Sequence, residues 1–210
     1  MKTSEQVEKL EQALLQQMGR YGLELSPDAL ARLSSYHEFL LTWNNRLHLV
    51  APCSPEEFAR RHILESLILV SHLPHGAKVA DVGSGGGLPT LPCLIARPDL
   101  TATLIESSQR KAIFLREALN KTGTAHLATI IARPFEKITA PPVDFVTCRA
   151  LDRFIQKLSG LIRWAPVNSS LLLFGGEALI DQLQQNGVRF TKLLIPNSEK
   201  RFLLSVVKPV

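Results

Sequence analysis

The chain has 210 residues and a mass of 23.3 kDa, and 45% of its residues are hydrophobic and 20% charged. This balance is typical of a globular domain with a substantial core and excludes disorder for most of the chain. The formal net charge of +5 and the pI of about 9.3 suit a polyanionic partner such as nucleic acid. The three cysteines, Cys53, Cys93 and Cys148, lack the spacing of a disulfide framework or zinc site. We therefore expect no metal and a reducing, cytoplasmic setting.

The first 75 residues are predicted to form an amino-terminal helical region. Ser26-Pro27-Asp28 and Ser54-Pro55-Glu56 are helix-start signals, in which a serine hydroxyl caps the helix and proline occupies its first turn. Pro74-His75-Gly76 closes the region. The polar amino terminus does not resemble a signal peptide, and no apolar run approaches the roughly 18 residues of a membrane span. We expect no association with a membrane.

Residues 76–210 change to an alternation of strands and helices, which predicts an open α/β sheet covered on both faces. Five apolar runs are predicted strands: 78–82, 101–105, 126–131, 143–148 and 170–174. The last two runs, 190–195 and 202–207, are joined by a segment too short for a helical crossover. They are therefore predicted to pair antiparallel. We treat 76–210 as one compact core beside the helical region.

A glycine-rich loop follows the first predicted strand: Asp81-Val82-Gly83-Ser84-Gly85-Gly86-Gly87-Leu88-Pro89. Glycines let the backbone turn sharply and let a ligand lie against the main chain. A dinucleotide-binding fingerprint requires a small residue where this chain has Leu88, which makes a nicotinamide oxidoreductase the least favoured class. The loop resembles instead the D-x-G-x-G-x-G loop of S-adenosylmethionine-dependent methyltransferases. That pattern assigns the ligand to Asp81, Gly83, Gly85 and Gly87, with Asp81 facing its amino-acid portion.

Glu106 ends the second predicted strand, where a carboxylate can accept hydrogen bonds from both ribose hydroxyls of a nucleoside. The same position also serves nicotinamide cofactors, so Glu106 alone does not discriminate between the two classes. A purely structural alternative is that the glycines only form a turn and that Glu106 caps the next helix.

Four further motifs accompany the glycine loop: Trp43-Asn44, Arg61-His62-Ile63-Leu64-Glu65-Ser66, Arg110-Lys111-Ala112-Ile113-Phe114-Leu115 and Cys148-Arg149-Ala150. Together the five motifs resemble the small-subunit ribosomal RNA methyltransferase G family, also called glucose-inhibited division protein B. The resemblance implies a Rossmann-like class I methyltransferase fold with a seven-stranded, mostly parallel sheet, an antiparallel last strand and amino-terminal helices. It implies methyl transfer from S-adenosylmethionine to N7 of a guanine in 16S ribosomal RNA.

By position, the resemblance assigns further cofactor contacts to Gly83, Leu88, Pro134, Phe135 and Arg149. In the family the pair at Pro134-Phe135 is small-then-acidic. Two interpretations stay open here: Phe135 stacks on adenine, or Glu136 takes the acidic place.

On the substrate side we expect Arg61 and His62 to shape the cofactor pocket or the RNA entrance. Arg149 is expected at the end of a strand that faces the ligand, where it can grip a phosphate or a carboxylate. Other candidates for a basic rim are Arg46, Arg60, Arg110, Lys111, Arg116 and Arg153. Three departures from the family stand out: His48-Leu49-Val50 replaces Asn-Leu-Thr, Pro89-Thr90 replaces Pro-Gly, and Phe174-Gly175 replaces Lys-Gly. The lost lysine removes a phosphate or base contact, so we expect the cofactor site to be better preserved than the RNA site.

Guanine N7 carries an in-plane lone pair and no proton, so its methylation needs no general base and we expect no catalytic residue. Cys148 is expected to pack at a strand end rather than act as a nucleophile. Trp43 and Trp164 are expected to be core or hinge residues rather than base-stacking platforms. We expect a monomer whose partner is 16S ribosomal RNA or the small ribosomal subunit. Two alternatives stay open: a methyltransferase with another RNA or a small-molecule acceptor, and a non-catalytic paralogue that binds S-adenosylmethionine or RNA.

Overall fold

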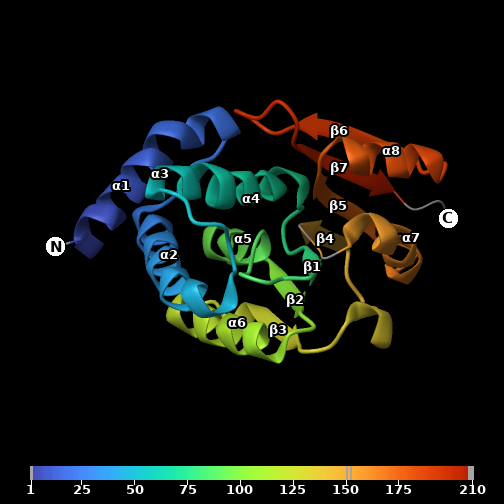
Figure 1. Ribbon diagram of the computed structural model, residues 1–210, viewed down its shortest axis with the longest axis horizontal. Helices are drawn as coiled ribbons and strands as arrows, with labels where there is room; N and C mark the ends of the chain where they lie inside the picture. Colours follow the sequence, from blue (N-terminus) through green and yellow to red (C-terminus); the bar gives the residue numbers. More distant parts are fainter. Residues whose placement is uncertain (1, 150, 152, 208–210) are drawn as a thin grey trace.

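The fold is an α/β sheet with an amino-terminal helical region beside it, seen in a computed structural model that describes residues 2–149, 151 and 153–207 (Figure 1). Ala150, the last residue of the Cys-Arg-Ala motif, lies outside these residues. The sheet has seven strands in the order β3-β2-β1-β4-β5-β7-β6. The strands are β1 (Lys78–Val82), β2 (Thr101–Ile105), β3 (Ala128–Ile131), β4 (Phe145–Arg149), β5 (Ser170–Gly175), β6 (Phe190–Leu194) and β7 (Phe202–Val207).

Strands β1 to β5 run parallel, and β7 lies antiparallel between β5 and β6. The predicted antiparallel pair is confirmed, with Phe190 opposite Val206. Several predicted strand boundaries were wrong: β4 begins at Phe145 rather than at residue 143, β5 ends at Gly175 and β6 ends at Leu194. Ala125–Leu127 forms a helical turn, η4, so β3 begins later than expected, and β4 extends to Arg149 itself. The seven-stranded, mostly parallel sheet with an antiparallel last strand is confirmed.

The amino-terminal region is helical, as predicted, and Ser26 and Ser54 cap two of its helices. The Ser26 hydroxyl oxygen accepts a hydrogen bond from Ala29 N at 3.1 Å, and the Ser54 hydroxyl oxygen accepts one from Glu57 N at 3.2 Å. The second cap opens one long helix built from four consecutive segments. The elements of the region are α1 (Lys2–Gln17), η1 (Met18–Tyr21), α2 (Pro27–Leu47), α3 (Pro55–Phe58), η2 (Ala59–Leu64), α4 (Glu65–Leu67) and η3 (Ile68–His72).

The remaining helices connect the strands and cover the two faces of the sheet. They are α5 (Thr90–Ala96), α6 (Gln109–Lys121), η5 (Phe135–Lys137), α7 (Phe154–Trp164) and α8 (Glu177–Gln185). Leu158 and Leu161 of α7 and Leu183 of α8 pack on one face. Leu91 of α5 and Phe114 of α6 pack on the other.

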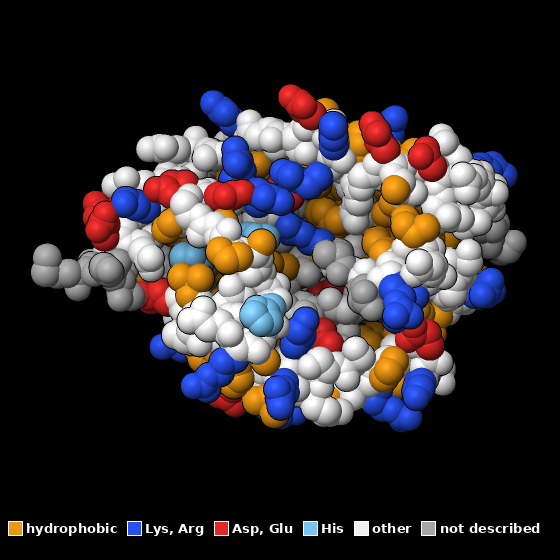
Figure 2. Space-filling view, viewed as in Figure 1, with side chains coloured by type: hydrophobic (Ala, Val, Ile, Leu, Met, Phe, Trp, Pro, Cys, Tyr) orange, Lys and Arg blue, Asp and Glu red, His pale blue; other side chains and the backbone are white. Residues whose placement is uncertain are grey.

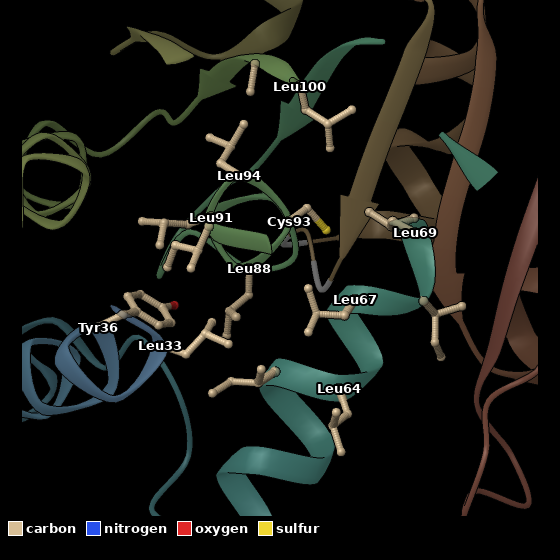
Figure 3. Packing of buried hydrophobic residues seen from close by; sticks show 14 of the residues in the cluster. Leu33, Tyr36, Leu64, Leu67, Leu69, Leu88, Leu91, Cys93, Leu94 and Leu100 are labelled. Atoms are coloured by element: carbon tan, nitrogen blue, oxygen red, sulfur yellow. The ribbon is translucent and has the colours of Figure 1, made fainter. Parts of the chain in front are cut away.

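The helical region shares its apolar core with the sheet. Figure 3 shows Tyr36 and Leu33 of α2 beside Leu88 and Leu91, with Leu64 of the long helix reaching the same cluster. Each of these side chains is buried, and burial of a large apolar side chain stabilises a fold by about 1.5–3 kcal/mol. The amino-terminal helices are thereby held against α5 and the glycine loop that precedes it.

Candidate functional site

A cleft of about 660 Å³ lies at the carboxyl ends of β1, β2 and β4, between the sheet and the helical region. Figure 2 shows this face of the molecule hollowed near its middle, with Lys and Arg side chains gathered above the hollow. Parallel α/β sheets bind ligands at this edge, and the volume lies within the range of small-molecule sites. The lining residues are His48, Leu49, Val50, Ala51, Arg61, His62, Gly83, Ser84, Gly85, Gly86, Leu88, Glu106, Ser107, Ser108, Lys111, Arg149 and Leu151.

The glycine loop forms the floor of the cleft. Gly83 N and Ser84 N both donate to the carbonyl oxygen of Ile105, at 2.8 and 3.2 Å, which folds the loop over the end of β2. Gly83 has a φ of +78°, and a Cβ there would lie 2.7 Å from Leu151 Cδ1. Only glycine fits this position without displacing a neighbour.

Of the other predicted loop residues, Gly85 and Leu88 line the cleft, whereas Gly87 does not. Gly87 has a φ of +86° and packs against Leu91, where a Cβ would come within 3.1 Å of the leucine Cβ. Gly87 therefore serves the turn into α5, which begins at Thr90.

Glu106 lines the cleft, and its carboxylate also accepts a hydrogen bond from the glycine loop. Its Oε2 accepts a hydrogen bond from Gly85 N at 2.9 Å, and its Oε1 accepts one from Ser108 N at 2.8 Å. Ser108 is the N-cap residue of α6, so Glu106 also stabilises the start of that helix, which is the structural role considered as an alternative. Because each carboxylate oxygen accepts more than one hydrogen bond, both oxygens keep capacity for hydroxyl donors in the cleft.

Asp81 lies behind the loop and does not line the cleft. Its side chain is fully buried on the α5 side, and neither carboxylate oxygen has a hydrogen-bond partner of normal geometry among the described residues. Burial raises the pKa of Asp81 to about 7, and the nearby hydroxyls of Thr90 and Ser84 oppose that rise. Such a buried, unpartnered carboxyl group provides acceptors just below the glycine loop.

Pro134 and Phe135 border a second, small cavity of about 30 Å³ that shares Gly83 and Leu151 with the cleft. Phe135 is buried, with its ring edge-on to Trp164 at 5.5 Å between centroids. Glu136 also borders this cavity and pairs with Lys157 at 3.0 Å. Phe135 and Glu136 are both beside the cleft, so both interpretations for the adenine contact stay open.

Arg149 ends β4 and ties it to the long helix. Its Nη2 donates to the carbonyl oxygen of Arg61 at 2.6 Å, and its Nη1 donates to the hydroxyl of Ser66 at 3.2 Å. The Glu65 carboxylate lies 3.7 Å from Nη2, and the Arg149 side chain is only 16% exposed. Burial lowers the pKa of Arg149, and Glu65 opposes this. Arg149 borders the cleft, but its guanidinium is largely engaged by the protein.

Arg61 and His62 lie on η2, a π-helical turn of the long helix, a feature often found at functional sites. Arg61 is 44% exposed and pairs with Glu57 at 2.8 Å. His62 packs on Phe58 with 5.0 Å between ring centroids. Burial lowers the pKa of His62 to about 3, and the charge of Arg149 lowers it further. A neutral imidazole therefore faces the cleft.

The helical region supplies a wall of the cleft that sequence reasoning missed. The Tyr36 hydroxyl donates to the carbonyl oxygen of Gly86 at 2.6 Å. Asn44 makes two 3.0 Å hydrogen bonds with the backbone of Val50, and these bonds hold the segment that carries His48 against the loop. The Trp43-Asn44 motif was the available signal. Its tryptophan packs against Phe114, which agrees with the predicted core position.

Proteins of similar sequence show the family to which this chain belongs. Residues 29–204 match the family model described as rRNA small subunit methyltransferase G. A relative of that name from Sorangium cellulosum is 32% identical over 81% of this chain and 74% of its own length. One from Gluconobacter oxydans is 39% identical over 67% of this chain and 69% of its own. The chain belongs to this family.

Solved structures of lower similarity share the fold of this family member. A SAM-dependent methyltransferase from Aquifex aeolicus aligns with a TM-score of 0.57 at 19% identity, covering 71% of this chain and 92% of that one. The O-methyltransferase from Bacillus cereus in complex with SAH aligns with a TM-score of 0.55 at 13% identity, covering 83% and 91%. These likenesses support the Rossmann-like methyltransferase fold.

Two departures from the family lie next to Arg149. Phe174, which replaces the family's lysine, places its ring 5.8 Å from the Arg149 guanidinium carbon. Cys148 is fully buried, and burial raises the pKa of its thiol, which favours the packing role over a nucleophile. Of these two neighbouring strand ends, Arg149 on β4 lines the cleft, whereas Phe174 on β5 does not.

The remaining basic residues that were predicted to form a rim differ in whether they line the cleft. Lys111 lines the cleft, whereas Arg46, Arg60, Arg110, Arg116 and Arg153 do not. Among the residues described, His, Cys, Asp and Glu side chains do not gather in a group of three or more that could hold a metal ion. None of the helices in this part of the chain has the length and apolar character that crossing a bilayer requires.

Proposed function

We propose that this chain transfers the methyl group of S-adenosylmethionine to N7 of a guanine in 16S ribosomal RNA. The main support is the cleft, which is lined by the glycine loop and Glu106. The relatives of this chain are named ribosomal RNA small subunit methyltransferase G. The cofactor and the acceptor guanine must both bind in this cleft, at the carboxyl edge of the sheet.

The residues of the cleft fit S-adenosylmethionine. Backbone at Gly83 and Gly85 is free of side chains, and Glu106 offers carboxylate oxygens to the ribose hydroxyls. The buried Asp81 carboxyl group lies beneath the loop and does not line the cleft, so we propose that it acts on the cofactor's ammonium group through the loop or a water molecule. We propose that Pro134, with Phe135 or Glu136, borders the adenine, since the small cavity they line opens beside Gly83.

When bound, S-adenosylmethionine supplies a sulfonium methyl group, which the N7 lone pair takes as the carbon–sulfur bond breaks, so that the positive charge passes from sulfur to the guanine ring. The chain's own residues need only hold the base in line, since N7 has no proton to remove. His62 is neutral at the cleft, so it adds no positive charge opposite the methylated base. Arg61 and Lys111 line the cleft and can contact an RNA phosphate or the guanine O6, whereas the Arg149 guanidinium is largely engaged by the protein.

The acceptor guanine must be unpaired or extruded. In an RNA helix N7 faces a deep, narrow groove that side chains cannot enter, so the base reaches the cleft only outside a regular duplex. We further propose that the protein acts in the cytoplasm and that it is a monomer, since one chain supplies all the described residues that line the cleft. Sedimentation velocity tests the monomer: a stable dimer would contradict it.

A second candidate is a methyltransferase with another RNA acceptor. Phe174 in place of the family's lysine, beside Arg149, favours it because that change removes a phosphate or base contact. Both candidates use the same cofactor site.

Transfer of tritium-labelled methyl groups tests the proposal. The full chain, labelled cofactor and small subunits from a strain lacking the protein are incubated, and borohydride and aniline cleavage then locates any 7-methylguanine in 16S ribosomal RNA. Label at N7 of one guanine supports the proposal. Label in another RNA supports the second candidate, and no label in any RNA would overturn both.

A further inference from the structure

A group of cations extends from Arg61 at the cleft to the place where the amino-terminal helices meet the loop that joins β6 to β7. We name it the arginine surface and define it by Arg20, Arg60, Arg61, Lys200 and Arg201. In Figure 2 Lys and Arg side chains gather above the hollow, over the long helix and the nearby β6–β7 loop of Figure 1. Three segments far apart in the sequence are thereby brought together, which no local motif could reveal.

The loop that carries Arg201 is fixed against the helical region. The Tyr21 hydroxyl donates to the carbonyl oxygen of Pro196 at 3.1 Å, and Arg20 Nη1 donates to Asn197 Oδ1 at 3.4 Å. Within the loop the Ser198 hydroxyl oxygen accepts a hydrogen bond from Arg201 N at 3.0 Å. Arg201 is therefore presented from a defined position.

A buried carboxylate joins the arginine surface to the cleft. Arg201 Nη2 lies 2.6 Å from Glu65 Oε1, and Glu65 Oε2 lies 3.7 Å from Arg149 Nη2. The Glu65 side chain is 2% exposed, whereas that of Arg201 is 39% exposed. The negative charge thus lies below the surface, and the positive charges of Arg201 and its neighbours face solvent above it.

The five cations of the arginine surface share these segments with four acids, Glu56, Glu57, Glu65 and Glu199. Glu57 pairs with Arg61 and the buried Glu65 pairs with Arg201, whereas Glu56 and Glu199 are exposed. Burial raises the pKa of the Tyr21 hydroxyl, while the charges of Arg60 and Arg201 lower it, which places both cations within electrostatic reach of the same tyrosine. Closely spaced guanidinium groups are suited to phosphate oxygens, which they bind through paired N–H donors.

We propose that the arginine surface binds the phosphodiester backbone of the RNA substrate beside the target nucleotide and so directs the strand into the cleft. The proposal rests on the proposed function and adds to it the path of the RNA. Neutralising a phosphate releases condensed counterions, so each contact makes binding more sensitive to salt.

Fluorescence anisotropy with labelled, unmethylated 16S ribosomal RNA tests the path, using the full chain at several salt concentrations. We expect Arg60→Ala and Arg201→Ala each to weaken RNA binding roughly 3- to 10-fold, and the double variant roughly 10- to 100-fold. The slope of log K against log salt should fall by about 0.7–0.9 for each lost contact. Affinity for S-adenosylmethionine, measured by calorimetry, should stay at the wild-type value in Arg60→Ala, because Arg60 does not line the cleft.

Two further variants serve as controls for this test. Arg201→Lys keeps the charge beside Glu65 and should retain most of the salt slope, which separates phosphate binding from a folding defect. Arg163→Ala, on exposed α7, is the matched control and should bind RNA like the wild type. A double variant with wild-type affinity and slope would overturn the proposal. If the wild type binds RNA but transfers no methyl group, the proposed function fails while the binding series still decides this surface.

Discussion

The hydroxyl of Tyr36 donates a 2.6 Å hydrogen bond to the carbonyl oxygen of Gly86, across the boundary between the helical region and the glycine loop. Tyr36 is fully buried, and burial raises the pKa of its hydroxyl, so it remains a donor. This bond makes the shape of the cleft floor depend on a helix that precedes the sheet in the chain.

Tyr36→Phe should lower the free energy of unfolding by about 1–3 kcal/mol, because the buried Gly86 carbonyl oxygen loses its donor while the ring still packs. Affinity for S-adenosylmethionine should fall as well, since the loop is less firmly held. Urea unfolding and calorimetric titration measure the two effects. Tyr21→Phe removes a tyrosine hydrogen bond to a backbone carbonyl outside the glycine loop, that of Pro196, and should leave cofactor affinity unchanged. Equal cofactor affinity in both variants would contradict this role.

Glu106→Ala should weaken cofactor binding by roughly 1–3 kcal/mol. The variant loses both the acceptors for the ribose hydroxyls and the hydrogen bond from Gly85 N. Calorimetric titration with S-adenosylmethionine measures the change. Glu117→Ala, on the exposed side of α6, is the matched control. Wild-type affinity in the Glu106 variant would disprove the ribose assignment.

Gly83→Ala should weaken cofactor binding by roughly 10-fold. The left-handed φ of +78° costs a non-glycine residue about 1–2 kcal/mol, and the new methyl group would lie 2.7 Å from Leu151 Cδ1. Gly160→Ala lies in α7 with no atom near its Cβ position, so it should be tolerated or slightly stabilising. Thermal melting with and without S-adenosylmethionine compares the two, and a ligand-induced shift of wild-type size in the Gly83 variant would contradict the prediction.

His37 should make the protein less stable in acid. Burial lowers the pKa of His37 to about 4, below its ordinary value of 6.5. Between these values the unfolded chain binds the proton more readily, so stability falls as the pH drops through this window. His37→Phe keeps a ring beside Phe58 and removes the titration. Its stability relative to wild type should rise by about 1–3 kcal/mol as the pH falls from about 7 to 4.

Denaturant unfolding at several pH values measures that difference. Asp81, whose raised pKa acts in the opposite direction, contributes equally to both proteins and cancels. His126→Phe, at an exposed position, is the control and should follow the wild-type pH profile. A pH-independent difference between His37→Phe and wild type would refute the assignment.

We propose that the helical region, residues 1–75, and residues 76–210 form one cooperative unit. Their shared core contains Leu33 and Leu64 on one side and Leu91 and Phe114 on the other. Residues 76–210 alone would expose that apolar surface and should aggregate or lack a cooperative thermal transition. Size-exclusion chromatography and melting monitored by circular dichroism test this, and a monomer of 76–210 with a cooperative melt would contradict it.

The sequence by itself determined the elements that depend on local chemistry. Serine caps at Ser26 and Ser54 predicted two helix starts, and the apolar run before Gly83 predicted β1 and the loop at its end. The strand–helix alternation and the short link before β7 predicted the sheet, because period and connection length are local properties. The five motifs predicted the family.

Only the tertiary structure decided how the site is closed and where its charges lie. The hydrogen bond from Tyr36 to Gly86 and the Arg201–Glu65–Arg149 network join residues remote in the chain, and no local spacing encodes such pairs. It also turned Asp81 away from the cleft and engaged the Arg149 guanidinium, because burial and partner geometry follow from packing of whole elements rather than from residue type.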